Sequence, residues 1–356
     1  MKYRIDAILK TLTPLHIAAP GAFRLNPETG YVEYASSSNE RMAPCTGIQK
    51  IKVNTGTGII SLPVIAANNI NGALRRHVAS IVLKSIRAHG RKVSLQAFSS
   101  LVCGAATSAP DKRDLSITEY RKSSSEPYMG LMGGGPRMLA RRAWLHNAEP
   151  LCQESINHLE RFAHPRASAH LQDTNKLTMA WHFRHNDDLM DLANVELQEE
   201  CIENYESAIQ ERQAAIMEEK AKGDRSKIST FAFSSFEFVI PGTLFGLLFE
   251  PEVNEAQLGL YLLALDSFAA NERLGGHARN GFGAFSLKDV VMTDESGKEV
   301  KIFENGRLDK TNKDVAPFLS AWANAAATVD VDLIEEMLTM QPVKEKKGKK
   351  VAQAEV

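Results

Sequence analysis

The chain has 356 residues, 44% of them hydrophobic, and its 42 basic residues face 43 acidic ones, for a formal charge of −1. This length exceeds the ~250–300 residues that a single core usually serves, which predicts two domains or one domain with a large insertion. The near-zero charge gives no reason to expect a generally basic nucleic-acid binder, so a polyanion site must come from local clusters of Lys and Arg.

The cysteines and the apolar runs exclude several further classes of protein. The cysteines lie about fifty residues apart without a CxxC pair, which fits neither a zinc site nor a disulfide scaffold. The N-terminus has no apolar run of signal-peptide length, and no run approaches the ~18 apolar residues of a membrane span. We therefore expect a cytoplasmic protein with no membrane partner, no metal and no cofactor.

The first half of the chain combines strand, helix and loop signals. Alternation of apolar and polar residues predicts the first strand, and clusters of Gly, Pro, Ser and Asn predict the loops. In the helix, Asn68 and Asn69 are the expected N-caps and Gly90 is the expected stop. In chain order, the predicted elements are a strand at 2–12, a loop or small hairpin at 18–60, the helix before Gly90, a loop at 104–136 and a short strand around 143–145.

The second half predicts an insertion followed by the rest of the same domain. The elements are an acidic helix within 187–222, two strands joined at Pro241-Gly242, a buried helix at 254–271 and a strand at 283–294. Without the insertion the order is βαββαβ, which predicts an α+β fold, an RRM-like (ferredoxin-like) palm with an antiparallel sheet. The predicted divisions are the first part of the palm at 1–150, a helical and thumb insertion at 151–228, the second part of the palm at 229–335 and a disordered Lys-rich tail at 336–356.

The stretch "RLGGHARNGFG" at 273–283 gathers glycines around a histidine and two arginines. A P-loop would need Lys and Ser or Thr where Phe282 and Gly283 stand, and a dinucleotide fingerprint would follow a strand instead of a helix. The sequence therefore favours either a plain helix-to-strand turn or a loop whose glycines allow close approach to a ligand.

Other candidate functional residues are basic, histidine or acidic. Basic clusters at the ends of predicted elements suit a groove that follows an RNA backbone, and they lie at 75–76, 84–92, 137–142, 161–166 and 273–279. The histidines His158, His164, His170, His182 and His185 show no metal-site pattern. His16 and the loop residues Glu28, Glu33 and Glu40 are candidate acids or bases, although acidic residues in a polar loop are usually only solvated.

Three segments resemble the RAMP superfamily (repeat-associated mysterious proteins) of CRISPR systems. "LTPLHIAAPG", which ends at Gly21, resembles the family's T-P-L-H-I-G entry, and "LGGHARNGFGAFSL" at 274–287 resembles its C-terminal glycine-rich loop. "LPVIAANNINGALRRHV" at 62–78 resembles the element that opens the family's first helix. Its "NGALR" core at 71–75 is intact, whereas residues 63–67 depart from the family's P-G-S-S pattern.

Within the superfamily, the length and single central insertion look most like the backbone subunit that coats guide RNA, above all in type IV effectors. The resemblance implies that copies form a filament along the guide crRNA and that target nucleic acid binds by guide pairing. It also implies other effector subunits as partners, including a 5′-handle capping subunit and a DinG-type helicase. Type III backbones cleave RNA with an Asp in the first loop, and residues 20–50 contain none, so we expect no enzymatic activity.

We expect the RNA phosphates to contact basic side chains and the glycine loop. The candidate residues are Arg75, Arg76, Arg141, Arg142, Arg273, Gly275, Gly276, His277, Arg279, Gly281 and Gly283. Two alternatives stay open. One is a RAMP-type endoribonuclease that acts on guide or target RNA through His16 or the loop glutamates, and the other is an RRM-like interaction protein without an RNA partner.

Overall fold

The computed structural model describes residues 1–21, 23–25, 32–34, 43–56, 58–104, 115–158, 171–186, 200, 203–221 and 231–340. The chain divides into two compact units. The larger unit comprises Met1–Ile17, Gln49–Leu177 and Val239–Val356, and the smaller one comprises Ala18–Ile48 and Thr178–Phe238. Among the described residues, no helix is long and apolar enough to cross a membrane.

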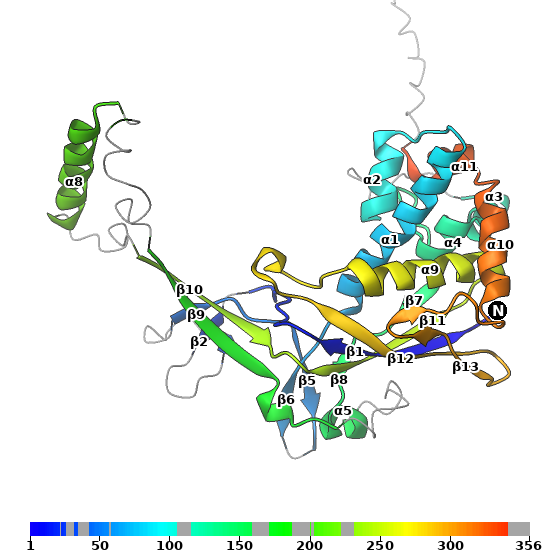
Figure 1. Cartoon of the computed structure of the whole chain (residues 1–356), viewed down its shortest axis with the longest axis horizontal. Coiled ribbons are helices and arrows are strands. Elements are labelled where there is room, and N and C mark those ends of the chain that lie inside the picture. Colours follow the sequence, from blue (N-terminus) through cyan, green and yellow to red (C-terminus); the bar gives the residue numbers. More distant parts are fainter. Residues whose placement is uncertain are drawn as a thin grey trace, which may run out of the picture. The chain divides into compact units, whose positions relative to one another are not determined.

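The larger unit is built on an antiparallel sheet with the strand order β13-β12-β1-β11-β7, and β8 also pairs with β11 (Figure 1). Its strands are β1 (Arg4–Thr11), β7 (Ala143–Leu145), β8 (Glu149–Pro150), β11 (Leu244–Pro251), β12 (Phe285–Thr293) and β13 (Glu299–Lys301). In the predicted βαββαβ order, β12, β1, β11 and β7 are the fourth, first, third and second strands. This is the strand order of a ferredoxin-like palm, so the predicted α+β fold is confirmed.

Strand β1 lies at the centre of the sheet and is buried on both faces. Ile5 is fully buried and pairs with Phe249 of β11, whose ring lies 5.9 Å from that of Tyr261 in the helix above it. On the opposite face, Ile8 packs with Leu151 and Leu244. Because strand side chains alternate between faces, an apolar strand with both faces covered belongs in the middle of a layered fold.

Helices α1 (Ala67–Ala88) and α9 (Glu255–Asn271) pack together on one face of this sheet (Figure 1). The expected N-caps of α1 are wrong, because the helix begins at Ala67, whose N–H donates to Asn147 Oδ1 at 2.9 Å. A distant side chain therefore caps the helix, and Asn68 lies inside its first turn. Gly90 follows the helix with a φ of +70°, which confirms it as the stop.

The predicted loop at 104–136 is wrong in part, because it contains α3 (Ile117–Ser125) and α4 (Pro127–Met132). Ser116 caps α3 in a capping box with Glu119, a local signal at the helix start. Further elements of this unit are α2 (Leu95–Cys103), α5 (Gln153–His158), η3 (Thr174–Lys176), η4 (Ala278–Asn280), β14 (Phe303–Glu304), β15 (Arg307–Leu308), α10 (Ala316–Ala326) and α11 (Val331–Leu338). The start of the predicted disordered tail is wrong as well, because residues 336–338 belong to α11; residues 341–356 lie outside the described residues.

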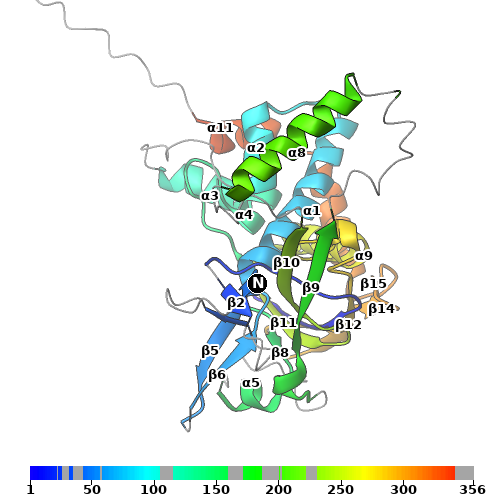
Figure 2. The ribbon, with the colours of Figure 1, turned by 90° about the vertical axis from the view of Figure 1, so that its left-hand side faces the viewer.

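The hairpin of β5 (Lys50–Asn54) and β6 (Ile59–Pro63) lies on the other side of the sheet from α1 and α9 (Figures 1 and 2). In the smaller unit, β9 (Thr178–Asn186) pairs with β10 (Phe231–Val239), as Figure 2 shows. The same unit holds α8 (Tyr205–Ala221) and the sheet of β2 (Phe23–Leu25), β3 (Val32–Tyr34) and β4 (Ala43–Cys45). The predicted helix within 187–222 is confirmed for α8, and the predicted limits of the insertion stay a prediction.

A buried carboxyl group caps the start of α4. Glu126 is 6% exposed, and its Oε2 accepts the Met129 N–H at 2.6 Å, whereas Oε1 has no hydrogen-bond partner among the described residues. Burial raises the pKa of Glu126 to about 7, and the nearby Asp330 carboxylate adds to this effect. The folded state therefore keeps a proton on Glu126 that the unfolded chain releases near its ordinary pKa of 4.5.

We expect Glu126→Gln to remove a pH dependence of stability. A raised folded pKa stabilises the fold at low pH, and this contribution is lost as the pH rises from about 4.5 to about 7. The loss amounts to roughly 3 kcal/mol for a shift of this size. Urea unfolding at pH 5 and pH 8 should show the variant close to wild type at pH 5 and more stable at pH 8. Equal differences at the two pH values would contradict this assignment.

Candidate nucleic-acid interface

The glycine-rich loop that follows α9 is held against the chain just after β1. The Gly276 N–H donates to the His16 carbonyl at 2.8 Å, and the Gly283 N–H donates to the Pro14 carbonyl at 2.9 Å. The loop closes on itself through the Leu274 N–H, which donates to the Gly283 carbonyl at 3.0 Å. Two segments more than 250 residues apart in sequence thus form one structure at the end of α9.

The four glycines of this loop do different things. A Cβ at Gly275 would lie 2.2 Å from the His16 carbonyl oxygen, and one at Gly283 would lie 2.1 Å from the Leu274 carbonyl oxygen. These two glycines therefore allow close approach of the protein's own backbone. The sequence had raised the possibility that the loop glycines allow close approach of a ligand. A Cβ at Gly281 would meet no described atom within 4 Å, and one at Gly276 would make an ordinary contact with His16 at 3.6 Å. Gly281 therefore faces open space, whereas Gly276 lies against His16 with room for a small side chain.

The arginines of the loop are exposed, and the helix face beside them supplies a third. Arg273 lies at the loop's start, with Nη1 3.5 Å from the Gly281 carbonyl, and Arg279 lies in the short helix η4. Arg76 of α1 forms an ion pair with Glu272, the residue that precedes Arg273, with 3.3 Å between Nη2 and Oε1. The structure thus brings Arg76, Arg273 and Arg279 to the end of α9, where exposed guanidinium groups can meet phosphates.

The base of the loop is tied to α1 by a histidine. The two ring nitrogens of His77 lie 2.9 Å from Ser267 Oγ and 3.1 Å from Glu272 Oε2. Burial raises the pKa of Glu272, but the His77 hydrogen bond and the Arg76 charge outweigh it and hold that pKa below its ordinary value. Glu272 is therefore a carboxylate that fixes α1 to the start of the loop.

A histidine of the loop, His277, packs against the buried His16 beneath it. The rings of His16 and His277 are 5.1 Å apart in an edge-to-face arrangement, and the His277 ring is 5.8 Å from that of Phe282. His16 is 3% exposed, whereas His277 is half-buried and has a φ of +60°. The buried position of His16 gives it a packing role under the loop, and His277 is the member of the pair that solvent reaches.

Arg75 has a structural role in a different place. Its guanidinium donates to the Tyr128 hydroxyl and the Gly133 carbonyl through Nη1, both at 2.9 Å, and to the Met132 carbonyl through Nη2 at 2.6 Å. These acceptors are at α4 and its C-terminal end, so Arg75 joins α1 to α4. The positions of Arg75 and Arg76 on α1 are adjacent in sequence, yet one points into the protein and the other outward.

Arg141 and Arg142 lie just before β7 and are half-buried. Burial lowers the pKa of Arg141, and the positive charge of Arg75 lowers it further. The hydrogen bond from Arg142 lowers the pKa of the Tyr120 phenol. The predicted phosphate contacts therefore fall into two groups: one at the glycine loop, and one formed by Arg75, Arg141 and Arg142 within the helical layer.

The other histidine, acidic and basic candidates lie away from the glycine loop in sequence and do not form a common cluster among the described residues. Glu28, Glu40, His164, His170 and the basic cluster at 161–166 lie outside the described residues. Glu33 lies on β3, His158 ends α5, and His182 and His185 lie on β9. His146 lies after β7, with Nε2 2.8 Å from Glu250 Oε2. Within the described ranges, no three His, Cys, Asp or Glu side chains are arranged to hold a metal ion.

Two exposed apolar residues on β9 are not among the candidate residues identified from the sequence. Met179 is 56% exposed and Trp181 is 51% exposed, and their i, i+2 spacing places both on one face of the strand. The Trp181 ring lies 5.9 Å from that of the buried Phe238, which orients the indole. The alternation in "TMAWHF" carried this signal. An exposed, oriented indole is suited to stacking on a nucleobase.

Comparisons with known proteins place the chain beside two solved CRISPR assemblies. A chain of the "Type IV-B CRISPR Complex" matches with a TM-score of 0.46 and 13% identity over 88% of this chain and 100% of that chain. A chain of the "Cryo-EM structure of the Type III-B Cmr-beta bound to cognate target RNA" matches with a TM-score of 0.35 and 11% identity, over 84% of this chain and 61% of that chain. No family model and no curated protein matches the sequence. At these levels of similarity neither structure assigns an activity to this chain.

Proposed function

We propose that this protein is a CRISPR effector backbone subunit that binds guide crRNA along its length, most like the type IV backbone. One observation carries the proposal. Within the two segments that resemble the entry (ending at Gly21) and the glycine-rich loop (274–287) of the RAMP superfamily, residues 12–17 and 274–284 are hydrogen-bonded to each other beside β1 of a ferredoxin-like palm. Their union presents Arg273 and Arg279 on an open loop, which is how a backbone-following RNA site is built.

The proposal has three further parts. Copies of the chain line the guide as a filament, and target nucleic acid is recognised by base pairing to the guide while the protein reads shape and phosphate. Other effector subunits, among them a 5′-handle capping subunit and a DinG-type helicase, complete the complex. The subunit itself cleaves no RNA, because residues 20–50 contain no Asp and His16 is buried under the loop.

The test is the salt dependence of RNA binding by the variant Arg273→Ala/Arg279→Ala. Each phosphate contact to a single strand contributes about 0.7 to the slope of log affinity against log salt, so the double variant should lose about 1.4. A matched control, Arg121→Ala/Lys301→Ala, removes the same charge from exposed positions elsewhere and should leave the slope unchanged. Filter binding with single-stranded RNA of two lengths gives both the slope and the number of subunits bound.

The same binding mixtures decide between the alternatives. Intact RNA on a denaturing gel, with and without Mg²⁺, supports a subunit without nuclease activity, whereas discrete products would establish the endoribonuclease. Equal salt-dependence slopes for the double variant and the wild type would mean that the glycine loop does not contact the RNA phosphates. Absence of salt-sensitive RNA binding by the wild type would contradict the proposal and favour the remaining alternative, an RRM-like interaction protein that has no RNA partner. A subunit count that does not grow with RNA length would exclude coating.

A further inference from the structure

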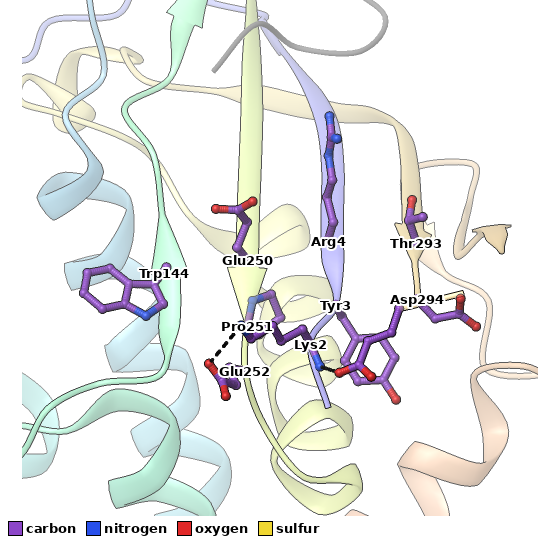
Figure 3. Close-up of a pocket in the computed structure, with 10 residues that line it drawn as sticks. Lys2, Tyr3, Arg4, Trp144, Glu250, Pro251, Glu252, Thr293 and Asp294 are labelled. Atoms are coloured by element: carbon purple, nitrogen blue, oxygen red, sulfur yellow. Dashed lines mark hydrogen bonds and ion pairs between the residues drawn. The ribbon is translucent and has the colours of Figure 1, made fainter. Parts of the chain in front are cut away.

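A pocket of about 540 Å³ opens on the palm sheet (Figure 3). It lies at the start of β1, whereas the glycine loop contacts the chain after the end of β1. It is lined by the start of β1, the ends of β11 and β12, and the short edge strand β7. Across the sheet, Arg4 pairs with Thr293 and Glu250 pairs with Trp144. Residues opposite each other in antiparallel strands point to the same face, so this row forms the floor of the pocket.

The pocket is on the sheet face that turns away from α1 and α9. Ile5 and Phe249 point toward the helices, and the preceding Arg4 and following Glu250 therefore point to the other face. On this face the indole of Trp144 is 58% exposed. Figure 3 shows the carboxylates of Glu250 and Glu252 extending from β11 toward the side on which Trp144 lies.

The charges of the pocket favour a cation. Four carboxylates line it, those of Glu250, Glu252, Asp294 and Glu295, against the two cationic side chains of Lys2 and Arg4. The Lys2 ammonium lies 4.0 Å from Glu252 in a solvent-exposed pair, and the backbone N–H of Lys2 donates to Glu295 Oε1 at 2.5 Å. His146, on the adjoining strand end, contacts Glu250. A phosphate entering here would meet a net negative charge, which separates this site from the proposed RNA surface.

We propose that this pocket binds an arginine side chain presented by a protein partner. A guanidinium group can stack on the exposed Trp144 indole while its N–H groups reach the carboxylates of Glu250 and Glu252. Arginine suits both contacts because it is planar, always charged and carries several donors. The edge position of β7 leaves the Trp144 side of the pocket accessible to an approaching chain. The proposal does not depend on RNA binding.

The test follows the indole signals of the full ¹⁵N-labelled chain by NMR. The sequence has three tryptophans, and Trp144→Phe identifies the signal of Trp144 by its absence. The probes are acetyl-Gly-Arg-Gly-amide and the same peptide with uncharged citrulline in place of arginine. We expect the arginine peptide to shift the Trp144 signal saturably and the citrulline peptide to bind at least several-fold more weakly.

Variants divide the contributions of the indole and the carboxylates. Trp144→Ala should weaken arginine-peptide binding roughly two- to thirty-fold. Because this variant lacks the indole signal, its binding is measured from the shifts of the backbone amide signals of Glu250 and Thr293. Glu250→Gln/Glu252→Gln should weaken it to a similar extent while keeping the shape of the side chains. Phe98→Ala, at a 44% exposed ring on α2, is the matched control and should change nothing.

Three results would overturn the proposal. The first is a Trp144 signal that does not shift at about 10 mM arginine peptide, because a dissociation constant above this concentration is too weak for a specific contact. The second is equal affinity for the citrulline peptide, which would mean that the pocket does not recognise charge. The third is single-stranded RNA that shifts Trp144 and competes with the peptide, which would make this a nucleic-acid surface. Conversely, self-association of the chain that Trp144→Ala abolishes would support it, with a second copy as the partner.

Discussion

Gly283→Ala should destabilise the protein by roughly 3 kcal/mol or more, because the new Cβ has no space. It would lie 2.1 Å from the Leu274 carbonyl oxygen and 3.0 Å from the Leu274 nitrogen, which are backbone atoms that cannot rotate away. The φ of +81° at this position adds the strain of a left-handed alanine. The hydrogen bonds that join the loop to Leu274 and Pro14 would have to open.

Gly281→Ala is the matched control in the same loop. Its φ of +84° carries the same backbone strain, yet its Cβ would meet no described atom within 4 Å, so we expect a loss of about 1 kcal/mol. Urea unfolding followed by circular dichroism compares the two variants. Similar losses for both would mean that the close approach to Leu274 does not constrain the fold.

Arg75→Ala should cost about 3–5 kcal/mol of unfolding free energy, although arginine is usually a surface residue. The variant leaves the carbonyls of Met132 and Gly133 without their charged donor, whereas the buried Tyr128 hydroxyl loses one partner and still donates to the Leu101 carbonyl. Each such unsatisfied buried group costs about 1–3 kcal/mol. Arg75→Lys should recover only part of the loss, because an ammonium group lacks the planar fork that reaches all three acceptors.

Arg76→Ala provides the neighbouring control for Arg75. Its contact with Glu272 is at the surface, so its removal should cost no more than about 1 kcal/mol. The same urea experiments measure both. If the two arginine variants lost equal stability, or if Arg75→Ala were folded normally and failed only in RNA binding, the structural role of Arg75 would be refuted. The pair thus separates a residue that holds the fold from one that is free to contact RNA.

The sequence predicted the palm because its signals there are local and repeated. Alternation in β1, the double strand broken at Pro241-Gly242 and the capped apolar run of α9 each specify their element within a few residues. The right order of these elements then led to the ferredoxin-like arrangement. Where the deciding partner is distant, the prediction failed: α1 is capped by Asn147, which no pattern near Asn68 could indicate.

The candidate site was predicted as a set of residues, and the tertiary structure decided what each one does. The sequence singled out 273–283, because glycines and arginines are rarely so concentrated, but it could not tell that Gly275 and Gly283 make room for the protein's own carbonyls. Adjacent arginines on α1 looked equivalent in sequence, and the 100° turn between consecutive helix residues sends Arg75 to α4 and Arg76 to solvent.

The sequence by itself determines local features: where the chain changes direction, which positions can adopt a positive φ, and where basic residues cluster. It does not determine proximity, because proximity depends on how strands pair. The union of residues 12–17 with the glycine loop, and the row of Arg4, Glu250 and Trp144 across three strands, exist only once β1 lies between β11 and β12. Both surfaces proposed here for partners follow from that pairing, which no short stretch of the chain specifies.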